Sequence, residues 1–147
     1  MIAGVVMMVL VRYVMRMRVI VVFQTPLLAG FQQFGFEHAS NRRVFLFFFD
    51  PQCMHCFDAA KRMSQYHWGD TRVVGIPISQ PQWAPQFSRD TGLRMDISPD
   101  LEKLKQIFPY TSVPAGVALE NGREKAALVK FEGDEPEASL KNVGLVN

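Results

Sequence analysis

Residues 44–56 have the sequence Val44-Phe45-Leu46-Phe47-Phe48-Phe49-Asp50-Pro51-Gln52-Cys53-Met54-His55-Cys56. The first six residues are apolar, with β-branched and aromatic side chains, a pattern typical of a strand buried on both faces of a sheet. Residues 50–52 end this run, and beyond Cys53 apolar or small residues recur at helical spacing through Tyr66. The stretch therefore predicts a central strand followed by a helix, with Cys53 at the junction.

The rest of the chain continues the alternation of strands and helices. Asn121 and Gly122 lie between the apolar runs 113–120 and 125–131, which is the strongest short-range signal for a β-hairpin in this chain. The other expected elements are a strand at 72–79, a helix at 80–91, a short strand at 93–97, a helix at 98–108 and a terminal helix at 136–143. This order predicts an α/β arrangement of layers.

Large apolar side chains at strand and helix spacing are expected to form the core. The Phe-rich strand, Trp68, Trp83 and the methionines belong to this set. Trp83 and Tyr110 are also candidates for lining a groove near the cysteines.

Length and composition favour one globular domain. The chain has 147 residues, of which 48% are hydrophobic and 20% charged, unlike the charge-rich composition of disordered chains. The net charge is +2, and no block of Lys and Arg accompanies exposed aromatic residues, which argues against nucleic-acid binding. The basic excess comes from Arg12, Arg16 and Arg18, which indicates addressing or membrane topology.

Residues 1–36 differ from the rest of the chain because apolar runs dominate them. Neither run, 1–11 or 19–31, reaches the ~20 residues that a membrane-spanning helix needs. Residues 19–23 also fit a first β-strand, and the whole segment fits the stub of a longer membrane region. The folded domain is expected to cover residues 37–147.

An export signal is the interpretation that we favour for this N-terminal segment. Translation from Met15 or Met17 would give a short basic region, an apolar region at 19–31, and small residues at Ala39 and Ser40. That is the order of a secretory signal, and a membrane anchor would have a similar pattern.

The chain contains two cysteines, Cys53 and Cys56, which are too close together to staple distant parts of a fold. At a helix N-terminus, unpaired backbone N–H groups and the helix dipole stabilise a thiolate, so Cys53 is the candidate nucleophile. Cys56, one turn along, could attack a mixed disulfide formed at Cys53 and is the candidate resolving thiol. His55 could stabilise the thiolate by charge or a hydrogen bond; the alternative is a solvated loop histidine.

Zinc binding is the main alternative for the two cysteines. The obvious additional ligands are His38, His55 and His67, and the chain has no second pair of closely spaced cysteines. Covalent haem attachment requires histidine directly after the second cysteine, where this chain has Phe57. The position between strand and helix favours redox chemistry over a metal site.

Residues 48–56, followed by Ser112-Val113-Pro114 and the Asn121-Gly122 hairpin, resemble the thioredoxin superfamily, and within it the bacterial TlpA-like branch of the cell envelope. The resemblance spans roughly residues 40–147. It implies an α/β, thioredoxin-like fold with a central mixed β-sheet flanked by helices and an inserted strand-helix unit between residues 72 and 97. It also implies a thiol-disulfide oxidoreductase that needs no organic cofactor or metal.

The resemblance also implies site residues and partners. Pro114, preceded by Val113, matches a cis proline that faces the cysteines and whose preceding backbone pairs with the substrate chain. The implied partners are protein thiols and disulfides, together with a membrane or soluble electron-transfer partner. The implied location is the periplasmic or extracytoplasmic side of the cell envelope, with the cytoplasm as the alternative; membrane proteins of the DoxX or MauE type join a similar domain to membrane helices.

Two positions depart from the family pattern. Phe47 occupies the place where thioredoxin-like reductases often hold a buried acid, so proton transfer from Cys56 must use water, Asp50 or another group. Met54 replaces the proline or glycine common after the first cysteine, and the peroxiredoxin pattern is absent. A non-catalytic binding module with the same fold is therefore kept as an alternative beside the zinc protein.

Overall fold

The computed structural model describes residues 43–98, 101–108, 110 and 112–147. Five strands form one mixed sheet in the order β3-β2-β1-β4-β5. β2 is parallel to β1, and β3 is parallel to β2, whereas β4 is antiparallel to β1 and β5 is antiparallel to β4. The strands are β1 (Arg43–Phe49), β2 (Arg72–Pro77), β3 (Asp96–Ile97), β4 (Ala115–Glu120) and β5 (Arg123–Leu128).

The helical elements follow the predicted order. They are α3 (Met54–Met63), the 3₁₀ turn η2 (Pro81–Trp83), α4 (Ala84–Thr91), α5 (Leu101–Ile107) and α6 (Glu137–Asn142). The inserted strand-helix unit consists of β2, η2 and α4, and the alternation of strands and helices is confirmed. α3 ends before the predicted Tyr66, because the chain turns at Ser64 and the indole N–H of Trp68 donates to the carbonyl of Met63.

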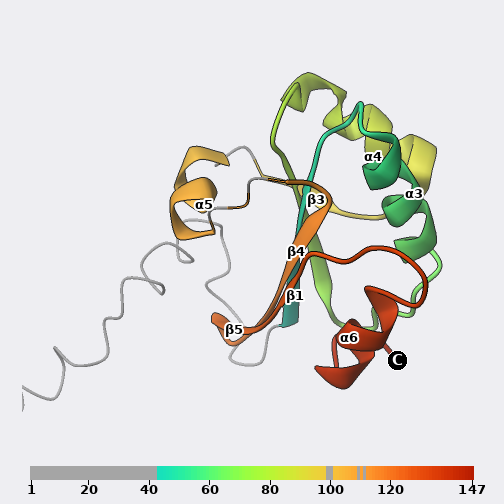
Figure 1. The fold of residues 1–147 in the computed structure, drawn as a ribbon, viewed down its shortest axis with the longest axis vertical. Helices are drawn as coiled ribbons and strands as arrows, with labels where there is room; N and C mark the ends of the chain where they lie inside the picture. The colour runs from blue at the N-terminus through green and yellow to red at the C-terminus, as the bar shows by residue number, and fades with distance from the viewer. Residues whose placement is uncertain (1–42, 99–100, 109, 111) are drawn as a thin grey trace, which may run out of the picture. The chain divides into compact units, whose positions relative to one another are not determined.

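The side chains of β1 alternate between two buried faces of the sheet. Phe45, Phe47 and Phe49 belong to the core cluster that also contains buried residues of α3, α4 and α6. Phe48 points to the other face, where its ring contacts Phe108 at the end of α5. In Figure 1, α5 accordingly lies on one side of the sheet and the other three helices lie on the opposite side. A strand covered on both faces must be apolar at every position, as the sequence of β1 is.

The hairpin between β4 and β5 forms where the sequence predicts it. Glu120 pairs with Arg123, which leaves Asn121 and Gly122 as a two-residue loop. Their φ angles are 54° and 73°, as a type I′ turn requires. The sequence places the turn correctly, although β5 begins two residues before the predicted Lys125.

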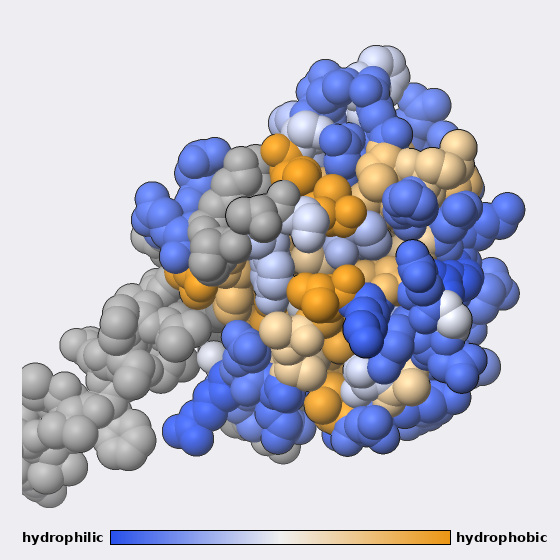
Figure 2. Space-filling view, viewed as in Figure 1, coloured by the Kyte–Doolittle hydropathy of each residue, from blue (hydrophilic) through white to orange (hydrophobic). Residues whose placement is uncertain are grey.

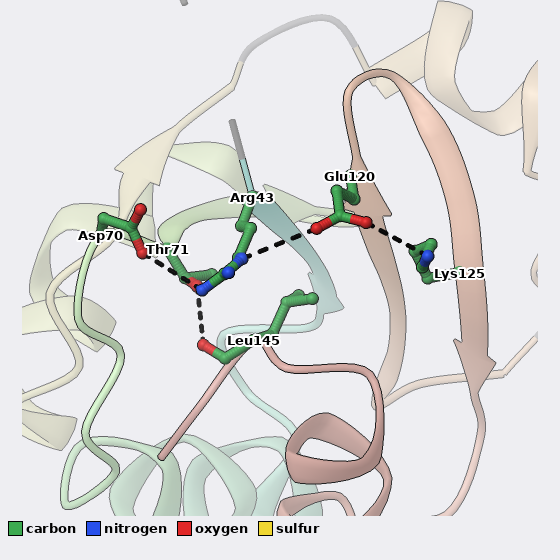
Figure 3. A network of polar contacts seen from close by, with 6 residues as sticks. All are labelled: Arg43, Asp70, Thr71, Glu120, Lys125 and Leu145. Carbon is green, nitrogen blue, oxygen red and sulfur yellow. Dashed lines mark hydrogen bonds and ion pairs between the residues drawn. The ribbon is translucent and has the colours of Figure 1, made fainter. Parts of the chain in front are cut away.

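A network of ion pairs joins strand ends at the end of the sheet where β1 begins. Arg43 lies between Asp70 and Glu120, at 3.5 and 3.7 Å, and Glu120 also contacts Lys125 at 3.1 Å (Figure 3). These side chains are partly exposed, so each pair contributes at most about 1 kcal/mol. The network lies at the opposite end of the sheet from Cys53 and does not form part of the site described below.

The N-terminal predictions fall outside the described residues. The described residues from Arg43 onward belong to one compact unit, and residues 1–42 are not described. Within the described part of the chain, no helix is long and apolar enough to cross a membrane.

Candidate active site

The topology brings Cys53 and Pro114 to the same end of the sheet, where β1 ends and β4 begins. Cys53 follows the carboxyl end of β1, and Pro114 directly precedes β4, which runs in the opposite direction. Because Phe48 pairs with Ala115, Pro114 lies beside the end of β1 although it is 61 residues from Cys53 in the sequence. The Val113–Pro114 peptide bond is cis, as the resemblance implies, and Glu135–Pro136 is also cis.

A tight turn delivers Cys53 to the start of α3. The carbonyl oxygen of Asp50 accepts the backbone N–H of Cys53 at 3.0 Å, and its carboxylate accepts the N–H of Gln52 at 2.9 Å. Cys53 is the N-cap residue of α3, and the first turn of this helix contains no acidic side chain. Within that turn, no carboxylate offsets the positive end of the helix dipole next to Cys53.

Cys56 lies one turn further along α3 and is fully buried, whereas Cys53 is only partly buried. Both thiols are free, and the two side chains lie within hydrogen-bonding reach of each other. Burial raises the pKa of Cys56 from 9.0 to about 12; the contact with Cys53 and the negative charge of Asp50 also raise it, while a hydrogen bond with the Asp50 backbone lowers it. The site thus combines one accessible and one protected thiol.

The buried surroundings of Cys56 are aromatic rather than acidic. Phe47 is fully buried, and its ring contacts those of Phe49 and Phe131 at centroid distances of 5.4 and 5.9 Å. An aromatic ring thus stands in this chain at the position where the family pattern often has a buried acid. Asp50 is the carboxylate whose charge acts on Cys56.

A groove of about 880 Å³ opens beside His55, the residue that precedes Cys56 in the chain. His55, Asp58 and Arg62 of α3 line one part of it, Val113 and Pro114 line another, and residues 129–133 after β5 line the third. The structure thus brings His55 together with Val113 and Pro114. The cysteines themselves are not among the described residues that line the groove, although Cys53 and Val113 pack against the same core cluster.

Sequence reasoning missed Asp58, Arg62 and the whole segment 129–133. Asp58 and Arg62 share a face of α3 with His55 by helical spacing, whereas residues 129–133 carry no local motif and reach the groove because they follow the end of β5. A hydrogen-bonded pair 69 residues apart, such as Arg62 and Phe131, leaves no signal in one sequence.

The prediction that Trp83 packs in the core is wrong. Trp83 is 49% exposed at the end of η2, because Ala84 and Phe87 occupy the buried positions of α4. The same prediction is wrong for Met54, which is 70% exposed, and Val129 is 65% exposed. Met54 directly follows Cys53, and Val129 follows the carboxyl end of β5, which runs in the same direction as β1, so both lie at the end of the sheet that carries Cys53. Tyr110 packs against the ring of Phe48.

Exposed apolar groups do not merge into one large patch on the face drawn in Figure 2. Hydrophobic surface there appears as small areas in the middle of the face, set among hydrophilic side chains.

The zinc alternative requires several ligands close together. In the ranges that the structure describes, no three His, Cys, Asp or Glu side chains gather where one ion could bind, and His38 lies outside those ranges.

Comparison with known proteins places this arrangement among solved structures. No protein-family model and no curated protein matches the chain. StoA from Bacillus subtilis is 15% identical, with a TM-score of 0.56, and the match covers 71% of this chain and 84% of that one. A thiol:disulfide interchange protein of the thioredoxin family from Chlorobium tepidum TLS is 16% identical, with a TM-score of 0.56 and coverages of 71% and 80%.

A secreted disulfide oxidoreductase of Mycobacterium tuberculosis, homologous to E. coli DsbE, is also similar. It is 16% identical, with a TM-score of 0.53, and the match covers 69% of this chain and 79% of that one. At such identities the likeness is one of fold. The chain therefore has a thioredoxin-like fold, a mixed five-stranded sheet with flanking helices that it shares with thiol-disulfide oxidoreductases.

Proposed function

We propose that the protein is a thiol-disulfide oxidoreductase that acts on protein thiols and disulfides through Cys53 and Cys56. The observation that carries the proposal is the asymmetry of the two thiols. Cys53 is partly exposed at a helix N-terminus, and Cys56 is buried within hydrogen-bonding reach of it. One thiol can meet a substrate, and the other can react only with what is bonded to the first.

In the reducing direction, the Cys53 thiolate attacks one sulfur of a substrate disulfide. A bond forms between Cys53 and that sulfur, and the other substrate sulfur leaves as a thiolate. Cys56 then loses its proton and attacks the Cys53 sulfur, which forms the Cys53–Cys56 disulfide and releases the second substrate thiolate. The substrate gains two electrons, the pair loses two, and the released thiolates take up the two protons that Cys53 and Cys56 gave up.

The neighbouring residues have supporting roles in this proposal. Asp50 carries the nearby carboxylate that can receive the proton of Cys56, because Phe47 closes the buried side. His55, which lines the groove, stabilises the Cys53 thiolate by charge or a hydrogen bond. The Val113–Pro114 segment binds the backbone of the substrate chain. No metal or organic cofactor takes part in these steps.

We further propose that the protein works in the cell envelope as a TlpA-like protein. The signal-like sequence of residues 1–36 supports this location, as does the similarity to a secreted oxidoreductase. In this setting a membrane or soluble electron-transfer partner resets the pair, and a membrane protein of the DoxX or MauE type is a candidate.

The first test is the redox equilibrium of the full chain against glutathione and dithiothreitol. We expect a reversible two-electron transition at Cys53 and Cys56. Alkylation of the free thiols and mass spectrometry measure the fraction of oxidised protein at each point of the series. A potential below about −250 mV indicates a reductase, and one above about −180 mV indicates an oxidase or isomerase. Absence of any Cys53–Cys56 disulfide across the series would refute the proposal.

The second test separates catalysis from binding. Cys56→Ser should accumulate a mixed disulfide between Cys53 and insulin chains, because the resolving thiol is missing, whereas the matched variant Cys53→Ser should accumulate none. Equal non-covalent binding by both variants, with no mixed disulfide, would favour a binding module. Stoichiometric zinc in the reduced protein, lost in both variants, would favour the zinc protein.

A further inference from the structure

Arg62 joins α3 to a segment that is distant in the sequence. Its Nη1 donates to the carbonyl oxygen of Gly133 at 3.0 Å, and its Nη2 donates to the carbonyl oxygen of Phe131. One guanidinium thus holds two carbonyls of the segment between β5 and α6, 69 and 71 residues away along the chain. Hydrogen bonds from a charged donor are stronger than neutral ones, and the planar fork of arginine fixes their direction.

The segment held by Arg62 forms one wall of the groove. Within residues 129–133, Phe131 is buried against Phe47, whereas Val129, Lys130, Glu132 and Gly133 are exposed. These residues belong to no helix or strand. Among the described residues, the hydrogen bonds that connect this wall to α3 are the two from Arg62. Phe131 therefore fixes the depth of the segment, and Arg62 fixes its distance from the helix.

The wall that faces residues 129–133 is formed by α3, the helix that carries Arg62. His55, Asp58 and Arg62 are spaced by three and then four residues, so they share one face of α3, and all three line the groove. Cys53 caps the helix that carries this face. A shift of the 129–133 wall relative to α3 would change the width of the groove without moving the cysteines.

We propose that Arg62 is a positioning residue that sets the width of this groove and so governs affinity for polypeptide disulfides. The inference rests on the proposed function and adds a determinant of substrate binding to it. Arg62 acts through the carbonyls of Phe131 and Gly133 and not on the reacting thiols. Consistent with this, the pKa of Cys56 is shifted by burial first, and then by Asp50 and Cys53, and Arg62 is not among the causes.

The test compares Arg62→Gln and Arg62→Lys with Lys61→Gln in the full chain. Lys61 is the exposed neighbour of Arg62 on α3, so Lys61→Gln removes the same charge without touching the wall. Reduction of insulin reports binding of a polypeptide, and reduction of 5,5′-dithiobis(2-nitrobenzoic acid) reports the reaction with a small disulfide. The redox equilibrium of the pair and the urea midpoint are measured for every variant.

For Arg62→Gln we expect the KM for insulin to rise about tenfold and kcat to change less than about twofold, since a charged hydrogen-bonded clamp is lost. The preference for insulin over the small disulfide should fall by a similar factor, and the redox equilibrium should stay within experimental error. Arg62→Lys keeps the charge but not the fork, so its KM should be intermediate. Lys61→Gln should match the wild type.

An unchanged KM for insulin in folded Arg62→Gln would overturn the inference, as would an equal loss with both substrates. If Arg62→Gln does not fold, Arg62→Lys decides the question by the same KM criterion. A wild-type protein that reduces neither substrate would instead refute the proposed function, and with it the role of Arg62. A normal wild type with unaffected variants refutes only the role of Arg62.

Discussion

Replacing Cys53 by serine makes Cys56 the single cysteine of the chain, so that its titration can be measured alone. In the wild type, burial is the largest cause that raises the pKa of Cys56 to about 12. Cys53→Ser removes two smaller contributions in the same direction, but the thiol stays fully buried. Between pH 7 and 9, the thiolate fraction of Cys56 should therefore be about two to three orders of magnitude below that of an unburied thiol.

Alkylation by iodoacetamide, followed by mass spectrometry between pH 7 and 10.5, measures this difference. The rate at Cys56 in Cys53→Ser should rise about tenfold per pH unit over the whole range and reach no plateau. Restricted access alone would lower the rate equally at every pH and leave the position of a plateau unchanged. The control is Cys56→Ser, whose partly exposed Cys53 should react faster at each pH because the reagent can reach it.

A plateau below about pH 10 for Cys56, in a variant whose circular dichroism shows an intact fold, would refute this reasoning. It would mean that burial does not disfavour the thiolate to the extent that the structure indicates. The resolving step would then need no separate proton acceptor such as Asp50.

Three further predictions concern stability, each measured as the free energy of unfolding in urea. The free energy of unfolding of the reduced protein should fall by up to about 4 kcal/mol as the pH rises from about 9 to about 12, because folded Cys56, with its raised pKa, keeps a proton that the unfolded state releases. Cys56→Ala should lack this component, and an identical pH profile in that variant would contradict the assignment. Phe47→Leu should cost about 1–2 kcal/mol and Phe47→Asp more than about 3 kcal/mol, since the ring lies in a fully buried aromatic cluster; an Asp variant as stable as the Leu variant would show that the site is not apolar. Gly116→Ala should cost about 1–3 kcal/mol, because a Cβ there would lie 2.4 Å from the buried ring of Phe45, and an unchanged urea midpoint would show that the ring can move.

The local features of the fold could be predicted from the sequence because each depends on residues close together in the chain. The apolar run of β1, the loop at Asn121 and Gly122, and the position of Cys53 at a helix N-cap all follow from neighbouring side chains and backbone preferences. The order of the elements and the α/β arrangement follow from these local signals, whereas the thioredoxin-like fold was expected from the family resemblance. The role of His55 was inferred from its place between the two cysteines, whereas the roles of Val113 and Pro114 came from the family resemblance, and all three are proposals.

Contacts between distant residues were decided by the tertiary structure alone. The sequence shows that Cys56 follows Cys53 by one turn, but only the packing of α3 on the sheet buries Cys56 fully and raises its pKa. Periodicity assigned Trp83 to the core, yet competition for the buried positions of α4 leaves it exposed. Arg62 lies in no motif, and its hydrogen bonds to the segment after β5 join residues separated by about half the chain. Local sequence specifies strands, turns and helix ends, whereas the shape of the groove depends on which distant segments the sheet brings together.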